Sequence, residues 1–405
     1  MRLPATSSRG YAPMADYRLI ELDSVRRISR LLEQVAAEAQ TISSDLLLQH
    51  ESSASTVARV ARSAHLSSRH VLMKADAAEP GGGWADRSTC LNRYSTSGDS
   101  LQSLIRSNRA RALEELWLVA SELNRFAGLG FKAGPLFNGL RQDYDTLTRL
   151  IGMNLVYFAV DSSAPIGTRS SRAGYRAGVW IGPADANHVL VMIPGMSTTT
   201  HSWLESNVPD AERLQDQTSR LADREGQGSV AIVPLLSYSP PRNILEAPLG
   251  RFWRDGSKET AAALASIPLD NRHVVGWGHS YGAAVLGATA AIGGVFDDLI
   301  MVGAAGTGTE TLEELGVTSE HLFVATNWND PIRLVPNDYH GVNPVTLPHT
   351  AIPTAPATDF DPWKAIFGIP WLLIDGLPDH DYLEDEIAMR AFAALTIGLD
   401  DLSDR

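Results

Sequence analysis

The 405-residue sequence has a single cysteine, no long apolar run and no excess of positive charge. Because Cys90 is the only thiol, an intrachain disulfide is excluded, and a thiol-based metal site would need other ligands. No window approaches the length that spans a bilayer as a helix. The formal net charge of -13 argues against nucleic acid or an anionic membrane surface as the main partner.

A Sec-type signal peptide and internal repeats are also absent. Residues 1–16 contain arginines but no apolar core, so they are not a Sec-type signal peptide, and we expect a flexible leader. The absence of disulfides fits a reducing compartment, which makes the cytoplasm the expected location. The composition is that of an ordinary globular protein, and a chain of 405 residues predicts two domains.

The first domain, residues 17–165, is expected to be a helical bundle. Its apolar residues recur at alternating spacings of three and four, which is typical of amphipathic helices. Asp99 and Ser100 supply N-cap chemistry for one of these helices. The four predicted helices cover residues 17–49, 54–78, 100–128 and 139–158. We find no catalytic motif in this part of the chain.

Residues 170–405 are predicted to form an α/β catalytic domain. Short, continuously apolar runs alternate with helical stretches, and such runs are typical of parallel strands buried on both faces. A mostly parallel sheet with helices on both faces is therefore expected. The predicted strands are 175–181, 188–193, 229–235, 272–277, 299–303 and 321–326, with a last apolar run at 369–374.

The G-H-S-Y-G motif at residues 278–282 organises this domain. It follows an apolar strand and precedes a helix of small residues, which is the context of a nucleophile elbow. At an elbow the serine adopts a strained turn conformation, and side chains at 278 and 282 would collide with the neighbouring strand and helix. The motif therefore predicts Ser280 as a nucleophile at the carboxyl edge of the sheet. A Gly-rich βα turn with a buried serine is the structural alternative.

A serine nucleophile needs a base, and the base needs an orienting carboxylate. His380 is the predicted base because it follows the last apolar run and precedes a helix. Asp330 is the predicted acid, since it comes four residues after a strand and is followed by a proline that fixes the turn. Asp375, which also ends an apolar run, is the alternative acid. The other downstream histidines, set aside as the base, are His321, His340 and His349.

The oxyanion hole is expected to consist of two backbone N–H groups aimed at the developing negative charge. One comes from Tyr281, at the start of the helix after the nucleophile. The other comes from Met196, in a Pro-Gly loop where glycine lets the backbone approach the substrate; an ordinary turn is the alternative. This chemistry needs no metal or organic cofactor. Residues 334–373, Pro-rich and then aromatic, are predicted to cap the site and form an acyl pocket; the alternative is that they are core, which is preferred for residues 371–374.

These motifs occur in the order found in α/β-hydrolases, which this part of the chain resembles. They are P-G-M at 194–196, G-H-S-Y-G at 278–282, D-P at 330–331 and H-D-Y at 380–382. More narrowly, the chain resembles an actinobacterial family of α/β-hydrolases in which a helical segment precedes a G-H-S-Y-G catalytic domain. The resemblance implies esterase-like chemistry and a triad of Ser280, Asp330 and His380, but no particular substrate.

The N-terminal helices resemble, more weakly, the helical hairpins of type VII secretion substrates. They depart from that pattern because W-A-D at 84–86 stands where a W-x-G turn is expected. Two hypotheses follow. The leading one is a serine hydrolase that cleaves a small-molecule carboxylic ester through an acyl-enzyme. The alternative is a secretion-linked or scaffolding protein with an inert hydrolase fold, whose helices bind a protein partner or self-associate and which uses a type VII-like export route.

Overall fold

The computed structural model describes residues 101–129, 133–243, 245–293, 295–327, 330, 332, 340–355 and 382–400. The chain divides into two compact units, Met1–Tyr94 and Ser95–Arg405, and every described residue belongs to the second unit. The leader and the first two predicted helices therefore lie outside the described residues.

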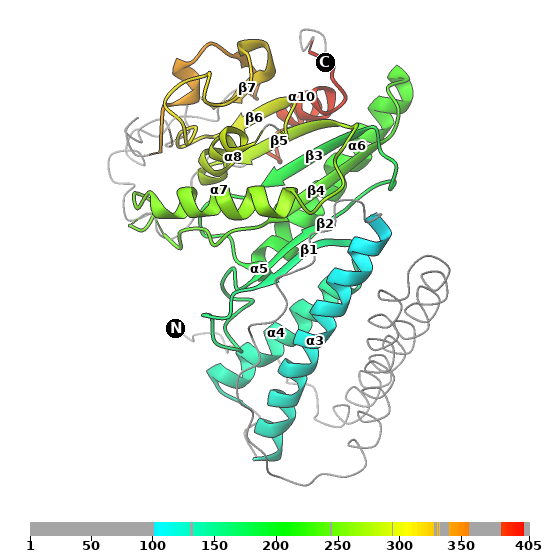
Figure 1. Cartoon of the computed structure of the whole chain (residues 1–405), viewed down its shortest axis with the longest axis vertical. Coiled ribbons are helices and arrows are strands. Elements are labelled where there is room, and N and C mark those ends of the chain that lie inside the picture. The colour runs from blue at the N-terminus through cyan, green and yellow to red at the C-terminus, as the bar shows by residue number, and fades with distance from the viewer. Residues whose placement is uncertain are drawn as a thin grey trace, which may run out of the picture. The chain divides into compact units, whose positions relative to one another are not determined.

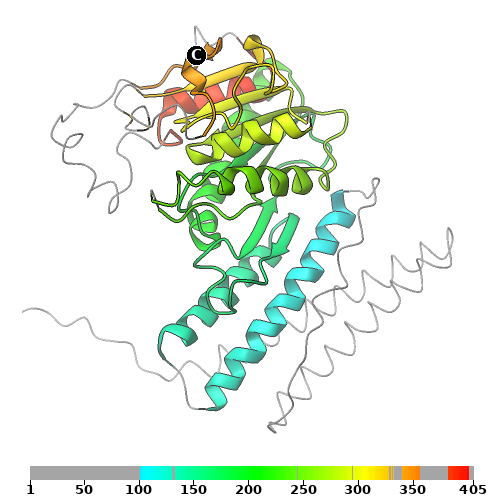
Figure 2. The ribbon, with the colours of Figure 1, turned by 60° about the vertical axis from the view of Figure 1, so that its left-hand side comes forward.

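Two helices open the described part of the chain. They are α3 (Leu101–Gly128) and α4 (Pro135–Ile151), and they lie side by side (Figure 2). The start of α4 suits Pro135, because the first turn of a helix leaves its N–H groups unpaired anyway. The predicted helices at 100–128 and 139–158 are confirmed as elements, but the second prediction runs too far along the chain.

Residues beyond Gly152 leave the helix and form a strand, β1 (Leu155–Val160), which pairs with the sheet. The expectation of helix up to residue 158 is therefore wrong. The unit that holds the sheet also contains α3 and α4, so these helices group with it rather than with Met1–Tyr94. A separate bundle over residues 17–165 stays a prediction, since most of that range lies outside the described residues.

Within the described residues the sheet has eight strands in the order β1-β2-β4-β3-β5-β6-β7-β8, of which Figure 1 labels β1 to β7. The pairs β1–β2 and β2–β4 are antiparallel, whereas all pairs from β4 through β3 to β8 are parallel. The remaining strands are β2 (Tyr175–Val179), β3 (His188–Ile193), β4 (Val230–Leu236), β5 (His273–His279), β6 (Asp298–Val302), β7 (Leu322–Ala325) and β8 (Thr350–Ala351). The predicted mostly parallel sheet is confirmed.

Helices cover both faces of the sheet. They are α5 (Thr200–Ser202), the π-helical turn η2 (Trp203–Asn207), α6 (Val208–Glu225), α7 (Arg251–Leu264), α8 (Tyr281–Ile292) and α10 (Glu386–Thr396). Two short 3₁₀ turns are η3 (Ser319–His321) and η5 (Pro344–Thr346). No helix in the described ranges is both long and apolar enough to cross a membrane.

Strand β3 shows why the parallel strands are continuously apolar. Val189 and Val191 pack into the core beneath α7 and α8, while Leu190 and Met192 pack into the opposite core beneath α6 and α10. Successive side chains of a strand point to opposite faces, so a strand covered on both sides has no polar face. Figure 1 shows α7 and α8 together on one face and α10 on the other.

Candidate active site

Ser280 lies in the turn that joins β5 to α8. Strand β5 ends at His279 and α8 begins at Tyr281, so a single residue makes the turn. Ser280 adopts φ 55° and ψ -123°, a conformation that L-residues rarely occupy. Its N–H donates to the carbonyl of Val302 at 2.8 Å, which ties the strained residue to β6. This is the geometry of a nucleophile elbow.

The glycines on either side of the elbow leave no room for side chains. A Cβ on Gly278 would lie 2.7 Å from the Cα of Ala283 in α8. On Gly282 it would lie 2.5 Å from the carbonyl oxygens of Ile193 and Pro194, at the end of β3. The predicted collisions are confirmed. The strand, the elbow and α8 therefore pack more closely than any larger residue would allow.

The loop after β3 lies against Ser280. A Cβ added to Gly195 would be 3.0 Å from the Cβ of Ser280 and 3.6 Å from its Oγ. Two hydroxyls hold this loop: Thr198 donates to the carbonyl of Gly195 at 2.9 Å, and Tyr238 donates to that of Pro194 at 2.7 Å. Burial raises the pKa of the Tyr238 phenol well above its ordinary value, so the phenol stays protonated and donates. Sequence reasoning missed Tyr238, which lies two residues after the end of β4.

Two backbone N–H groups near Ser280 have no acceptor within the described part of the chain. They belong to Met196, in the loop after β3, and to Tyr281, in the first turn of α8, where the N–H groups of a helix have no intrahelical acceptor. The next residue in the loop, Ser197, is fixed by a 2.8 Å bond from its N–H to the carbonyl of Pro241 and adopts φ 63°. Because buried or half-buried N–H groups are nearly always paired, two unpaired ones beside a serine hydroxyl can bind an anionic oxygen.

Asp330 is buried in the loop after β7. The hydroxyl of Tyr382 donates to its Oδ2 at 2.7 Å, and the N–H of Ile332 donates to its Oδ1 at 2.9 Å. The side chain is almost inaccessible, at 2% exposure for the residue. Strands β3, β5, β6 and β7 are parallel neighbours, so their carboxyl ends meet at one edge of the sheet. Asp330 and Ser280 follow the carboxyl ends of two of these strands.

Tyr382 links the acid to the elbow. Its ring meets the ring of His279 edge to face, with centroids 6.3 Å apart. His279 precedes Ser280 and stacks on Trp277 at 5.9 Å. The structure thus joins the elbow and Asp330 through one aromatic side chain, while the loop after β3 lies against Ser280. The predicted base His380 and the alternative acid Asp375 lie outside the described residues.

His340 lies beside the elbow, although sequence reasoning set it aside. It is buried, and its ring meets the Tyr281 ring edge to face, with centroids 4.9 Å apart. Burial of Tyr281 raises the pKa of its phenol, so this side chain at the start of α8 stays uncharged. The stretch of Pro, Asn and Gly around His340 gave no periodic signal from which this position could be predicted.

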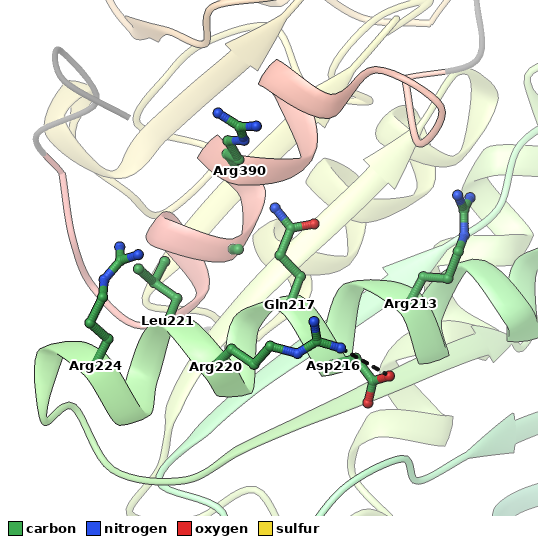
Figure 3. A pocket seen from close by; sticks show the side chains of 8 residues that line it. Arg213, Asp216, Gln217, Arg220, Leu221, Arg224 and Arg390 are labelled. Atoms are coloured by element: carbon green, nitrogen blue, oxygen red, sulfur yellow. Dashed lines mark ion pairs between the residues drawn. The ribbon is translucent and has the colours of Figure 1, made fainter.

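A surface cavity of about 680 Å³ lies away from this site, between α6 and α10 (Figure 3). Its charged lining consists of Arg213, Asp216, Arg220, Arg224 and Arg390. Each arginine already pairs with a carboxylate of its own helix or the residue beside it, at 2.6–3.8 Å. The positive charge is therefore balanced, and the cavity offers no nucleophile. Among the described residues, no group of His, Cys, Asp and Glu is arranged to hold a metal ion.

Comparison with known proteins shows which family this part of the chain is similar to. Residues 171–338 match a family described as "Alpha/beta hydrolase", and this range contains Ser280, Asp330 and the loop after β3. Uncharacterised proteins of Mycobacterium bovis and Mycobacterium tuberculosis are 26% identical over 208 residues, which cover 48% of this chain and 73% of theirs. These relatives agree with the resemblance to actinobacterial proteins.

Two solved structures have lower similarity. A dienelactone hydrolase-like promiscuous phosphotriesterase from metagenomic libraries has a TM-score of 0.34 and 17% identity, over 56% of this chain and 93% of that one. The 2,6-dihydroxy-pseudo-oxynicotine hydrolase has a TM-score of 0.25 and 13% identity, over 63% and 82%. Such scores carry no conclusion about function. The match over residues 171–338 and the mostly parallel sheet with its serine elbow show that this chain has the α/β-hydrolase fold, and that this part of it is similar to the α/β-hydrolase family.

Proposed function

We propose that the protein is a serine hydrolase that cleaves carboxylic esters through an acyl-enzyme, with Ser280, His380 and Asp330 as its triad. The observation that carries this proposal is the strained elbow at Ser280, flanked by the acceptor-free N–H groups of Met196 and Tyr281. A serine in a merely structural turn has no need of a strained backbone, and the loop after β3 adds a second donor to the one that the start of any helix offers.

In the first half of the reaction the Ser280 Oγ attacks the ester carbonyl. The Oγ–C bond forms as the hydroxyl proton passes to the imidazole of His380, and the carbonyl oxygen becomes an oxyanion. The N–H groups of Met196 and Tyr281 donate to that oxyanion, and one such donor stabilises the transition state by about 3–4 kcal/mol. The C–O bond to the alcohol then breaks, and the imidazole returns its proton to the departing oxygen.

In the second half, water replaces the alcohol. The imidazole takes a proton from water, the hydroxide adds to the acyl carbon, and Ser280 leaves with the proton restored. Asp330 accepts a hydrogen bond from the imidazole and stabilises its positive charge. His380 is two residues from Tyr382 in sequence, and two residues of chain span at most about 7 Å. Since Tyr382 bonds Asp330, connectivity supports His380 as the partner of this acid.

The test is labelling of Ser280 with a fluorophosphonate probe, together with hydrolysis of p-nitrophenyl esters of increasing acyl length. We expect the wild-type protein to label and turn over, and Ser280→Ala to do neither while its thermal midpoint hardly changes. Turnover retained by Ser280→Ala would overturn the proposal. A folded wild-type protein that never labels would favour the inert, scaffolding alternative.

The base and the acid are tested by paired variants. His380→Gln and Asp330→Asn should each lower kcat by several orders of magnitude, because one removes the proton carrier and the other removes the charge that stabilises it. His340→Gln and Asp375→Asn are the matched comparisons. If His340→Gln abolishes turnover and His380→Gln keeps it, His340 is the base. If Asp375→Asn abolishes turnover and Asp330→Asn keeps it, Asp375 is the acid.

A protein partner or self-association through the N-terminal helices remains part of this proposal, as does a cytoplasmic location. Residues 334–373 as a cap and acyl pocket are also proposed; of these, the described residues 340–355 form η5 and β8.

A further inference from the structure

The Tyr382 hydroxyl lies between two parts of the loop that follows β7. It accepts a hydrogen bond from the backbone N–H of Asn327 at 2.8 Å and donates to Asp330 Oδ2 at 2.7 Å. The residue is only 1% exposed. A buried phenol with both bonds made is expensive to disturb, because either broken bond would leave a polar group unpaired.

The direction of these two bonds is fixed by chemistry. A backbone N–H can only donate, so the phenol oxygen must accept from Asn327. The hydroxyl has one hydrogen, which is therefore directed to the carboxylate of Asp330. An O–H that donates to an ionised carboxylate makes one of the stronger hydrogen bonds in proteins.

The carboxylate is held from both of its oxygens. Besides the bond from Tyr382 to Oδ2, Oδ1 accepts from the N–H of Ile332 at 2.9 Å. Two donors on different oxygens fix the plane of the group. A carboxylate has about four acceptor positions, so these bonds also limit the directions from which an imidazole approaches.

The Tyr382 ring and the chain that follows it have separate contacts. On one side it meets the His279 ring beside the nucleophile. On the other, the chain continues to Asp385, whose carboxylate caps α10 by accepting from the N–H groups of Ile387 and Ala388. The tyrosine thus joins the elbow, the acid loop and the start of α10.

We propose that Tyr382 is a positioning residue for Asp330: its hydroxyl sets the orientation of the acid and the strength of the hydrogen bond that the acid offers to the catalytic imidazole. This proposal rests on the hydrolase function proposed above. The donated bond spreads the negative charge of Asp330, so the carboxylate stabilises the protonated imidazole less than an undisturbed carboxylate would. Tyr382 thus weakens the stabilisation of the imidazolium by Asp330 but fixes the orientation of the Asp330 carboxylate.

Removal of the hydroxyl in Tyr382→Phe separates these two effects. Loss of orientation should lower kcat about 10- to 100-fold, the effect of one lost hydrogen bond to a charged group. Loss of the donor should also concentrate charge on Asp330 and stabilise the imidazolium. The acid limb of kcat/KM against pH, which reports the base in the free enzyme, should then move to higher pH.

A graded substitution moves the limb in the opposite direction. Replacing Tyr382 by 3,5-difluorotyrosine keeps the ring and the hydroxyl but makes the phenol a stronger donor, so the acid limb should move to lower pH. If Tyr382 were purely structural, the substitutions would change the thermal midpoint. The pH of the acid limb would then not follow the donor strength of residue 382 across the three proteins. Tyr175→Phe, at a buried tyrosine where β2 begins, is the control and should leave the limb unchanged.

Rates are referred to the fraction of each protein that fluorophosphonate labels at Ser280, so a variant that folds poorly is still compared fairly. An acid limb that lies at the highest pH in Tyr382→Phe, lower in the wild type and lowest with difluorotyrosine supports the positioning role. Equal limbs and equal kcat in a wild type that labels would overturn this role and leave the hydrolase proposal intact. A wild type that does not label at all would overturn both.

Discussion

At the scale of single residues, Gly195 has almost no space for a side chain. An added Cβ would meet both the His279 carbonyl and the Ser280 Cβ at 3.0 Å. Such contacts can be relieved only by shifting the loop after β3 away from the elbow by a few tenths of an ångström. The N–H of Met196 belongs to that loop, so the shift would misplace a proposed oxyanion donor.

We therefore expect Gly195→Ala to lower kcat on small esters by about 10- to 100-fold, because misplacing one donor weakens part of its transition-state stabilisation. The thermal midpoint should fall by only a few degrees. Gly293→Ala, where an added Cβ meets nothing within 4 Å, is the control. A Gly195→Ala protein with wild-type kcat would show that this loop does not contribute to the oxyanion hole.

At the scale of elements, one buried carboxylate joins α4 to the segment that leads into β2. Asp143 is fully buried, and it accepts from the N–H of Gly167 at 2.6 Å and from the N–H and hydroxyl of Ser170 at 2.7 and 2.5 Å. The segment has no regular structure to pair its own backbone groups. The side chain of α4 therefore supplies their acceptors.

Asp143→Asn should lower the free energy of unfolding by about 1–3 kcal/mol, because the amide NH₂ must face at least one buried donor. Urea denaturation measures this loss. Asp145→Asn, at an exposed position of the same helix, should change stability little. An Asp143→Asn protein as stable as the wild type would mean that the segment finds other acceptors.

The sequence predicts the parallel strands well and the first strand badly. Strands β3 to β7 stand out because burial on both faces makes them continuously apolar between helical stretches. Strand β1 has the same kind of run, Leu155–Val160, but it follows a helix whose apolar spacing continues into it. A short apolar run does not by itself distinguish a strand from buried helix. Only pairing with β2 decides the matter.

The site is predictable to the extent that it follows from backbone geometry. Ser280 and the two glycines of its motif could be assigned because a strained turn restricts the residue types it accepts. Tyr238 and Tyr382 could not, because an isolated tyrosine carries no signal of the distant group that its hydroxyl will meet. Side-chain contacts across the fold depend on packing that no local pattern encodes.

At the scale of the whole molecule, the two edges of the sheet differ. The carboxyl edge holds the serine, whereas the amino edge holds a chain of hydrogen bonds between ionisable groups. His273 Nε2 and His321 Nδ1 each lie 2.7 Å from a different oxygen of Asp298. His273 Nδ1 lies 3.2 Å from His188 Nδ1, and His188 Nε2 lies 2.7 Å from the carbonyl of Gln227.

Counting hydrogens shows that one ring of this chain is charged. The carbonyl of Gln227 only accepts, so His188 Nε2 carries a hydrogen; His273 Nε2 carries another toward Asp298, and the Nδ1 pair needs a third. Two neutral rings hold only two. The bond to Asp298 raises the pKa of His273, whereas burial lowers that of His188. Of the two rings, His273 therefore binds the additional proton more tightly.

This network makes stability depend on pH. The raised pKa of His273 contributes stability that is complete below its unfolded value of about 6.5 and is lost as the pH rises through the folded value. Burial alone would raise the pKa of Asp298, but bonds from His273 and His321 outweigh it and lower the pKa. The lowered pKa of Asp298 contributes stability that is present above about pH 3.9, its unfolded pKa, and is lost as the pH falls through its folded pKa.

Asp298→Asn should consequently destabilise most between about pH 4 and 6.5, and its penalty should shrink at higher pH once His273 is neutral. Urea denaturation of both proteins from pH 4 to 9 measures the difference. Glu320→Gln, at an exposed acid next to His321, should show no such profile. A penalty that is constant across this range would mean that His273 is not charged in the folded state.

The division of the chain is the last property that can be tested on the whole molecule. The sequence predicts that a protein beginning near Ser170 keeps every proposed catalytic group. In the structure, however, β1 pairs with β2, and Leu101 and Ile105 of α3 belong to the same core as β3 and α8. Removal of these elements would expose apolar surface of that core to water, which costs about 25 cal/mol per Å² of exposed area. It would also leave β2 as an edge strand without a partner on one side.

We therefore compare two truncations. A variant beginning at Ser95 retains the whole compact unit, so it should fold with nearly the wild-type thermal midpoint and keep kcat on a small ester within about twofold. A variant beginning at Ser170 should be insoluble or melt far lower, because α3, α4 and β1 are gone. Fluorophosphonate labelling of the soluble fraction gives the active concentration in each case.

If the Ser170 variant is stable and fully active, the first strand and its two helices are dispensable. If the Ser95 variant folds but loses kcat, residues 1–94 shape the active site, and the boundary between 94 and 95 does not separate the functions of the two units.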